Sequence, residues 1–493
     1  MAYIIDIGLE VHAELATRSK MFCSCPVVEP TQVQPNSAVC PVCLGLPGTL
    51  PVVNKQAVEY GLRAALALNC TIASISIFAR KNYFYPDLPK GYQISQYEYP
   101  LAEHGFLPIR TSQGNKSIRI HRVHLEEDTG KLTHVETISE NYTLIDLNRA
   151  GVPLLEIVSE PDMHSAEDAR AYAEELRNLL RHLGINSGDM EKGAIRFEAN
   201  VSIRPENSSI LGTRVEIKNL NSFRSMEHAI AYQVEQQIKT LEAGEHVIQE
   251  TLGWDPVNMI TFTQRSKEEA HDYRYFPEPD LPPLVVDQEW INRIASDLPE
   301  LPFARYTRFM EQYGLSDSEA ALLTEDDATA RYFETCVNIA GEVPSHLIFK
   351  WMTGEIFAYL NQSGSRIDMI KVQPQEFIEL LRYIHAKKIT PITAKSVLSE
   401  MLQTGSTAST LIEKKGLLQV SDVEEISDLI SEVLNTHQEE MRSYLAGKET
   451  LSNWFFGQVM RKASGKANPQ VVRSELEKQL QEKKSKINSG GKS

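Results

Sequence analysis

The sequence of 493 residues lacks several features that define large classes of protein. No apolar stretch reaches the roughly 18 residues that a membrane-spanning helix needs, so we expect no contact with a membrane. The N-terminus has no basic segment followed by an apolar run, as a secretion signal would. We therefore expect a cytoplasmic protein.

Common nucleotide-binding and hydrolytic motifs are also missing. The sequence contains no G-x-x-x-x-G-K-[ST] loop, and no G-x-G-x-x-G follows a predicted strand, which argues against P-loop and dinucleotide-binding folds. It has neither a G-x-S-x-G elbow nor an obvious Ser-Lys amidase arrangement, so we expect that this chain does not release ammonia from amides by itself. Any nucleotide would be held through metal ions and basic side chains.

Basic residues are in the minority, since 50 Lys and Arg face 66 Asp and Glu, for a formal net charge of −16. A general nucleic-acid binder is disfavoured, because neutralising phosphates requires a basic face. The charge is uneven, however, and residues 461–492 contain nine Lys or Arg and three Glu. This segment is either a solvated helix or an RNA contact, and the charge pattern alone does not choose between them.

The hydrophobic pattern predicts three domains. Residues 1–293 mix short alternating segments with amphipathic helices, which indicates an α+β domain with a mixed or antiparallel sheet. A proline-rich passage at 276–283 precedes its end. Residues 294–408 predict an all-α domain, and residues 409–493 a small helical tail. The predicted strands are 4–13, 118–124, 142–147 and 201–204, and the predicted helices are 55–68, 166–183, 225–243, 320–340, 347–360 and 374–385.

Four of the six cysteines fall within 21 residues, as Cys23, Cys25, Cys40 and Cys43. Each short pair can supply two thiolates from one turn, which predicts a tetrahedral zinc site, although the first pair is CxC rather than the commoner CxxC. Four unrelated cysteines are the weaker alternative, and a reducing cytoplasm disfavours disulfides. A site closed by four thiolates has no open position, so we expect a structural Zn²⁺ that holds residues 20–50.

Carboxylates and histidines recur in the predicted strands. Glu10 and His12 share one face of a strand, because side chains alternate along it. Three consecutive carboxylates, at 126–128, end another strand. Further carboxylates in strand-like surroundings are Glu156, Glu198 and Glu216. Each alone would be an ordinary solvated edge, but together they predict a site for Mg²⁺, usually completed by nucleotide phosphates and water. The basic residues expected to bind the nucleotide are Lys81, Arg149 and Lys218.

Several short motifs together resemble the B subunit of the tRNA-dependent amidotransferases, the GatB family, over almost the whole chain. They include I-G-L-E-V-H at 7–12, R-K-N-Y-F-Y-P-D at 80–87, H-L-E-E-D-T-G-K at 124–131, E-I-K-N-L-N-S at 216–222 and Y-R-Y-F-P-E-P-D at 273–280. The resemblance implies a cradle domain like that of glutamine synthetase, then a helical domain and a YqeY-like tail that contacts tRNA.

The resemblance also implies a reaction and its partners. ATP phosphorylates the side-chain carboxylate of mischarged Glu-tRNA(Gln) or Asp-tRNA(Asn), and ammonia then displaces the phosphate to give Gln-tRNA(Gln) or Asn-tRNA(Asn). The ammonia comes from a separate amidase, the A subunit, and the small C subunit completes a heterotrimer. This division of labour would explain why the chain has no nucleophile motif of its own.

Carried over by position, the resemblance assigns metal binding and phosphoryl transfer to Glu10, His12, Glu127 and Glu216. Lys81 would meet phosphate, and Glu156 and Glu198 complete the set of expected catalytic residues. One departure concerns residues 196–200, which read R-F-E-A-N where many members have R-C-D-A-N. Glu198 therefore reaches about 1.5 Å further than the usual aspartate, the length of one C–C bond.

Two other interpretations stay open. A zinc-stabilised RNA-binding scaffold without catalysis would account for the cysteines and the basic C-terminus, but it leaves the strand carboxylates unexplained. The archaeal-type E subunit resembles the same family, but it carries a large extra domain for which 493 residues leave little room.

Overall fold

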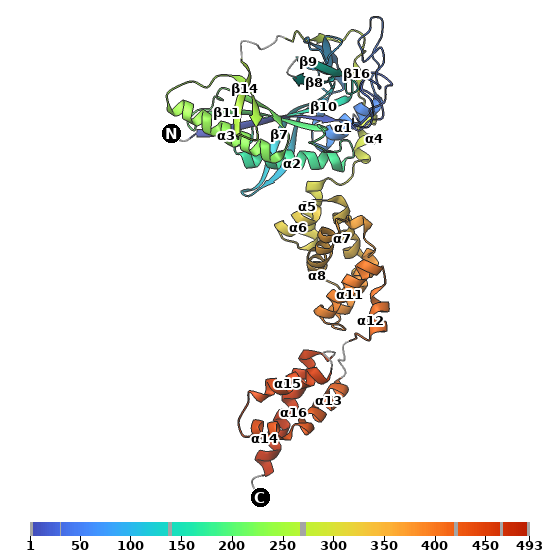
Figure 1. Cartoon of the computed structure of the whole chain (residues 1–493), viewed down its shortest axis with the longest axis vertical. Helices are drawn as coiled ribbons and strands as arrows, with labels where there is room; N and C mark the ends of the chain where they lie inside the picture. The colour runs from blue at the N-terminus through green and yellow to red at the C-terminus, as the bar shows by residue number, and fades with distance from the viewer. Residues whose placement is uncertain are drawn as a thin grey trace. The chain divides into compact units, whose positions relative to one another are not determined.

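The computed structural model describes residues 3–29, 31–136, 141–266, 273–418, 423–463 and 467–490. Residues 464–466 and 491–492 of the basic C-terminal segment lie outside these ranges. The chain divides into two compact units, Met1–Arg305 and Tyr306–Ser493 (Figure 1). The three-domain division at 293 and 408 stays a prediction.

A nine-stranded sheet forms the centre of the first unit, in the order β14-β13-β12-β11-β1-β10-β7-β6-β2. Its strands are β1 (Tyr3–Glu14), β2 (Thr71–Ile72), β6 (Ala102–Thr111), β7 (Gly114–Glu127), β10 (Pro153–Ser159), β11 (Ile195–Pro205), β12 (Val215–Leu220), β13 (Glu250–Asp255) and β14 (Ile260–Ser266). Neighbouring strands are antiparallel except β12 and β13, which are parallel. This mixed sheet confirms the predicted α+β class.

Three smaller sheets complete the strand structure of the first unit. Their strands are β3 (Ile75–Ser76) with β16 (Leu284–Val285), β15 (Phe276–Pro277) with β4 (Phe78–Asn82) and β5 (Tyr92–Gln96), and the hairpin of β8 (Lys131–Glu136) and β9 (Asn141–Asp146). The predicted strands at 4–13 and 142–147 correspond to β1 and β9.

Alternation of side chains gives the large sheet one apolar face and one polar face. In β1, Leu9 and Val11 are fully buried, whereas Glu10 and His12 are only partly buried and point to the other face. Helices α1 (Lys55–Ala67), α2 (Ala166–His182) and α3 (Phe223–Glu242) pack against the apolar face, and Figure 1 shows α2 and α3 along the same side of the sheet. The polar face is left free to carry a site.

The helices begin where the sequence supplies capping residues. The side chains of Asn54, Ser165 and Ser222 accept hydrogen bonds from the first backbone N–H groups of α1, α2 and α3. The helices predicted at 55–68, 166–183 and 225–243 are therefore confirmed. The helical pattern expected over 320–340 is divided between two helices, because the side chain of Asp326 accepts a hydrogen bond from the backbone N–H of Thr329 and begins the second helix.

The described residues of the second unit form helices joined by loops, with no strand among them. After α4 (Gln288–Ser296) in the first unit, the helices are α5 (Pro302–Tyr313), α6 (Asp317–Thr324), α7 (Asp327–Ile339), α8 (Ser345–Trp351), a π-helical turn (Met352–Ile356), α9 (Phe357–Ser363), a 3₁₀ turn (Ile367–Met369), α10 (Pro374–His385), α11 (Pro391–Thr404), α12 (Ala408–Lys415), α13 (Val423–Thr436), α14 (Gln438–Leu445), α15 (Leu451–Lys462) and α16 (Pro469–Gly490). Helices α13 to α16 enclose a hydrophobic core of their own. This confirms the predicted all-α character of the C-terminal part.

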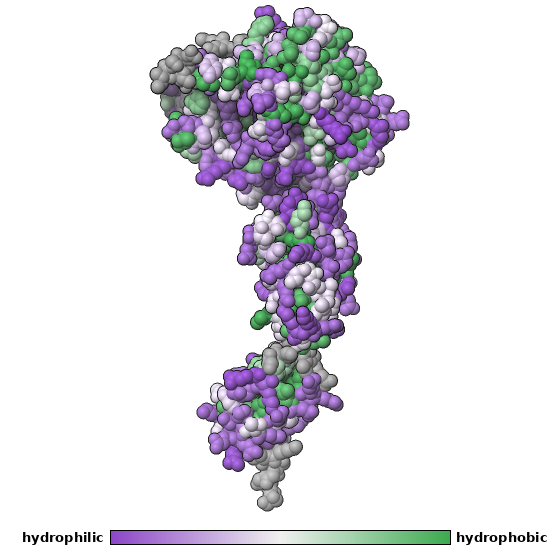
Figure 2. Space-filling view, turned by 45° about the vertical axis from the view of Figure 1, so that its right-hand side comes forward, coloured by the Kyte–Doolittle hydropathy of each residue, from purple (hydrophilic) through white to green (hydrophobic). Residues whose placement is uncertain are grey.

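Apolar side chains are exposed on parts of the surface. Figure 2 shows hydrophobic surface on the first unit, where Leu50, Val52 and Phe84 are among the exposed large apolar side chains. None of the described helices is long and apolar enough to cross a membrane.

Candidate active site

The polar face of the sheet gathers acidic and basic side chains from the adjacent strands β12, β11, β1, β10 and β7. The register of β1 with β11 puts Glu10 opposite Glu198, and its register with β10 puts His12 opposite Glu156. Strand β7 pairs with β10 so that His124 also lies opposite Glu156. Strand pairing, rather than nearness in sequence, brings these residues together.

One cluster on this face consists of His12, Glu126 and Glu156. The Nε2 atom of His12 lies 3.4 Å from Oε2 of Glu156 and 3.7 Å from Oε1 of Glu126. His124 approaches the same Glu156 oxygen at 3.2 Å. The three ligand atoms lie within 4.8 Å of one another. The two distances from His12 are shorter than the roughly 4.2 Å that separates opposite ligands of one cation bound at about 2.1 Å.

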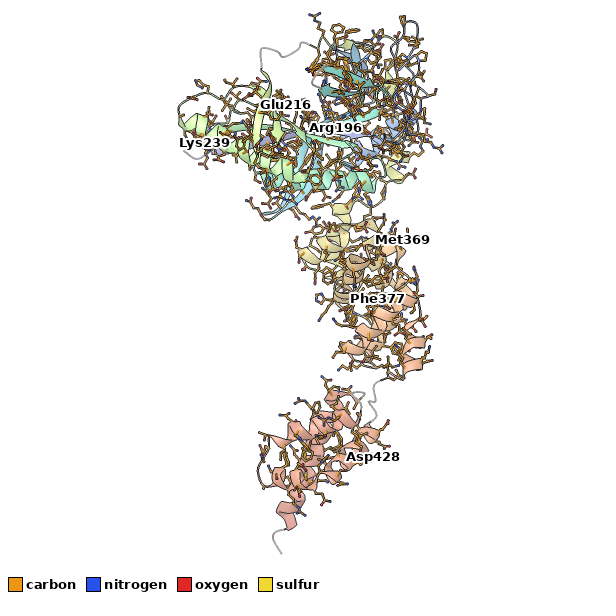
Figure 3. The ribbon with its side chains drawn as sticks, viewed as in Figure 1. Arg196, Glu216, Lys239, Met369, Phe377 and Asp428 are labelled. Carbon is orange, nitrogen blue, oxygen red and sulfur yellow. The ribbon has the colours of Figure 1, made fainter. Side chains whose placement is uncertain are left out.

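A second cluster consists of Glu10, Glu198 and Glu216, whose ligand atoms also lie within 4.8 Å of one another. The Nζ atom of Lys218 lies 2.9 Å from Oε2 of Glu198 and 3.5 Å from Oε1 of Glu216. Asn200 donates a hydrogen bond of 2.9 Å to Glu10. Glu216, labelled in Figure 3, lies on β12, which is separated from β1 by β11. Three carboxylates beside a single lysine leave negative charge that a metal ion would neutralise.

The two clusters influence each other electrostatically. Burial is the main cause that raises the pKa of Glu10, and the carboxylates of Glu156, Glu198 and Glu216 raise it further. Burial lowers the pKa of His12, but the hydrogen bond and charge of Glu156 outweigh it and raise the pKa to about 9. Because Glu156 of one cluster acts on Glu10 of the other, the clusters form one acidic site.

Lys81, on β4, faces this acidic site from another sheet. Burial lowers the pKa of Lys81, but the negative charges of Glu126 and, to a smaller extent, Glu156 outweigh it and raise the pKa. Its Nζ lies 5.0 Å from the centre of the Tyr273 ring. Within the described residues Lys81 makes neither a hydrogen bond nor an ion pair through Nζ, so it is available to meet phosphate.

The other predicted nucleotide-binding residues are already engaged. Lys218 bridges two carboxylates, as described above. Arg149 donates hydrogen bonds of 3.1 and 2.8 Å to two backbone carbonyls of the loop 128–130. Arg196, labelled in Figure 3, donates a bond of 3.0 Å to the carboxylate of Asp128 in this loop. Both arginines therefore fix the loop that follows β7.

The structure does not bring Glu127 into either cluster, contrary to the expectation for this residue. Because side chains alternate along β7, Glu127 points away from the face that carries Glu126. Its carboxylate accepts a hydrogen bond of 3.0 Å from the backbone N–H of Ile94 and forms an ion pair with Lys90. Glu126, one of the three consecutive carboxylates at 126–128, stands beside His12 instead.

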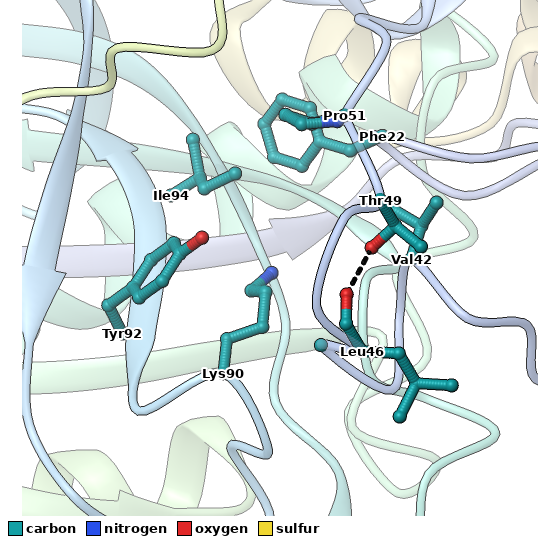
Figure 4. A pocket seen from close by; sticks show the side chains of 9 residues that line it. Phe22, Val42, Leu46, Thr49, Pro51, Lys90, Tyr92 and Ile94 are labelled. Carbon is teal, nitrogen blue, oxygen red and sulfur yellow. Dashed lines mark hydrogen bonds between the residues drawn. The ribbon is translucent and has the colours of Figure 1, made fainter.

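Lys90 reaches Glu127 from a pocket between β5 and the cysteine-containing loop. Figure 4 shows its side chain between Tyr92 and Ile94 on one side and Val42 and Leu46 on the other. The ion pair therefore connects the end of β7 with the neighbourhood of the cysteines.

The four cysteines Cys23, Cys25, Cys40 and Cys43 form a third cluster, with Sγ atoms within 4.8 Å of one another. The Sγ atoms of Cys40 and Cys43 are 3.9 Å apart, close to the roughly 3.8 Å that tetrahedral geometry gives for a Zn–S length of 2.3 Å. A hydrogen bond from the Cys23 thiol is the main cause that lowers the pKa of Cys43. All four side chains are free cysteines, so they fit a structural metal ion.

Family models and individual proteins match most of this chain. The GatB/GatE catalytic domain family matches residues 5–292, and the GatB domain family matches residues 331–480. The B subunit of the aspartyl/glutamyl-tRNA(Asn/Gln) amidotransferase of Thermodesulfovibrio yellowstonii is 49% identical over 98% of this chain and 100% of its own length. The B subunits of Persephonella marina (47% identical, 96% of this chain and 98% of the relative) and Thermotoga maritima (45% identical, 98% and 100%) are similar. The chain belongs to the GatB family, the B subunits of the aspartyl/glutamyl-tRNA(Asn/Gln) amidotransferases.

Proposed function

We propose that this chain uses ATP to activate the side-chain carboxylate of Glu-tRNA(Gln), Asp-tRNA(Asn) or both, and then converts it into an amide. It would act in the cytoplasm as the B subunit of a heterotrimer, together with an amidase (the A subunit) and a small C subunit. The observation that carries the proposal is the pair of adjoining acidic clusters on one sheet face, with Lys81 beside them.

The proposed reaction has two steps. An oxygen of the substrate carboxylate attacks the γ-phosphorus of ATP and ADP leaves, which turns a poor electrophile into an acyl phosphate. Ammonia then attacks the acyl carbon, and inorganic phosphate and a proton leave as the amide forms. The chain has no motif for releasing ammonia from glutamine, which agrees with ammonia supplied by a partner.

Both clusters would supply ligands for magnesium. The proposed magnesium ligands are His12, Glu126 and Glu156 in one cluster and Glu10, Glu198 and Glu216 in the other. Magnesium bound there would shield phosphate charge and align the γ-phosphoryl group with the attacking oxygen. Lys81 adds a positive charge next to Glu126, where a phosphate oxygen could accept its hydrogen bond. Lys218 keeps Glu198 and Glu216 at a fixed spacing.

The test uses the chain reconstituted with its amidase and small subunits. With mischarged tRNA, ATP, Mg²⁺ and glutamine, the complex should release ADP and form amide. Glu126→Gln should lower both rates at least about 100-fold, while the glutaminase activity of the partner stays within twofold. Glu160→Gln is the matched control, because Glu160 is a partly exposed glutamate just beyond β10 that pairs with His121, away from the clusters.

Two outcomes would contradict the proposal. Absence of amide from the complete parent complex would exclude the activity, and an unaffected Glu126→Gln variant would exclude this site. Intact tRNA binding without ADP formation would favour a scaffold without catalysis.

A further inference from the structure

Lys20 is a fully buried lysine whose ammonium group contacts no carboxylate among the described residues. Its relative exposure is 0%, and its Nζ has two hydrogen-bond partners in the described part of the chain. These are Sγ of Cys43 at 3.7 Å and the backbone carbonyl of Leu147 at 3.2 Å. A buried ammonium group without a counter-charge is costly by several kcal/mol, so the fold needs a negative charge near this nitrogen.

The cysteine cluster supplies this charge when it holds a divalent metal ion. Four thiolates around one such ion carry a net charge of −2, whereas four neutral thiols carry none. The ammonium of Lys20 would reduce the net charge of the buried assembly to −1. The ammonium group and the metal-bound thiolates would therefore stabilise each other electrostatically.

The backbone holds Lys20 in this place. Its N–H donates to the carbonyl of Cys25 at 2.9 Å, which ties it to the first pair of ligands. Gly151 has a φ of +85°, and a side chain there would bring its Cβ to 3.5 Å from Cδ of Lys20. The neighbouring Met21 donates to the carbonyl of Gly151 at 2.7 Å. The lysine thus lies between the metal ligands and the segment 147–151.

We propose that Lys20 is a positioning residue of a zinc tetrathiolate site, where its ammonium group donates a hydrogen bond to the Cys43 thiolate and stabilises the metal-bound state. Residues that bind metal ligands in this way commonly change metal affinity 10- to 100-fold when they are replaced. The inference concerns metal retention and stands independently of the amide-forming reaction.

The experiment compares Lys20→Met with the parent chain and with Lys55→Met. Methionine keeps most of the apolar stem of Lys20 but removes the charge and the donor, and Lys55 is an exposed lysine at the start of α1. Zinc content is measured by elemental mass spectrometry, and zinc affinity by competition with a chromogenic chelator. Lys20→Met should raise the dissociation constant for zinc about 10- to 100-fold, and Lys55→Met should leave it within twofold.

Alkylation of individual cysteines separates this effect from unfolding. Under chelator challenge, Lys20→Met should expose the four cluster cysteines to iodoacetamide sooner than the parent does. Cys70 and Cys336 are buried in the first and second units and should stay protected. An unchanged zinc affinity would overturn the proposal, and so would zinc loss that occurs only together with alkylation of Cys70. A parent chain that binds no added zinc would overturn it as well.

Discussion

The cysteine cluster and the acidic site belong to the same unit but are built in opposite ways. The cysteines come from one irregular segment, 23–43, whereas the ligands of the acidic site come from five strands and span residues 10–216. Four thiolates close a tetrahedron and leave no position for a substrate. Carboxylates on an open sheet face leave positions for water and phosphate. We therefore propose that the cysteine site stabilises the scaffold and that the acidic site carries out the reaction.

Removal of magnesium should give the largest effect and separate the two sites. In the reconstituted complex, leaving Mg²⁺ out of the assay buffer should lower the rate of ADP formation at least about 100-fold, because charge on the transferred phosphoryl group would be unshielded. Added Mg²⁺ should restore it. Zinc content, measured on the same sample, should not change. ADP formation that survives without Mg²⁺, or that is lost in step with zinc, would contradict separate roles for the two sites.

Removal of the thiolates should instead weaken the fold. The double variant Cys40→Ser/Cys43→Ser takes two ligands from the metal site and should lower the free energy of unfolding of the first unit by about 4–5 kcal/mol. Urea denaturation followed by hydrogen exchange of β1 would measure this. Cys70→Ser, outside the cluster, is the control. At a temperature where the variant stays folded, amide formation should remain within tenfold, and a larger loss would give the cysteines a role in the reaction.

The adjacent residues Glu126 and Glu127 differ in a similar way. Glu127 forms an ion pair with Lys90, whereas Glu126 belongs to the acidic site. Glu127→Gln removes the counter-charge of Lys90, whose side chain is only 11% exposed, and this should lower the free energy of unfolding by about 3 kcal/mol. Adding Lys90→Met to this variant should recover most of the loss, because no buried charge then lacks a partner. Glu126→Gln, in contrast, relieves repulsion within the acidic site and should not destabilise the fold. Equal losses of stability in the two single variants would contradict the conclusion that Glu126 and Glu127 point to opposite faces of the sheet.

The same pair shows how far the sequence predicts the site. The spacing of the cysteines was sufficient to predict their cluster, because the ligands lie close together along the chain. In H-L-E-E-D, three carboxylates follow one another, and the family resemblance placed Glu127 in the site. Leu125 is fully buried on the apolar face, so alternation would have assigned Glu127 to that side and Glu126 to the side of His124. The alternation of side chains along this strand therefore predicts which of the two glutamates enters the site.

Other features of the site could not be read from local patterns. The pairing of β1 with both β10 and β11 decides that His12 meets Glu156 and that Glu10 meets Glu198. These partners are separated by more than a hundred residues, and their registers depend on tertiary packing. Helix positions were better predicted, since caps such as Ser222 act locally.

The smallest effect is expected at Glu198, where many family members have aspartate. Glu198→Asp draws the carboxylate back by about 1.5 Å and breaks its contact of 2.9 Å with Lys218. It keeps the charge, and an open cluster can admit a water molecule in the space. The Mg²⁺ concentration for half-maximal ADP formation should therefore change less than tenfold, or less than about 1.4 kcal/mol. Glu198→Gln keeps the length and removes the charge, so its change should exceed tenfold. If Glu198→Asp raised the required Mg²⁺ concentration as much as Glu198→Gln does, the site would depend on the position of this oxygen rather than on its charge. The acidic site would then constrain the positions of its ligands as strictly as the cysteine cluster does.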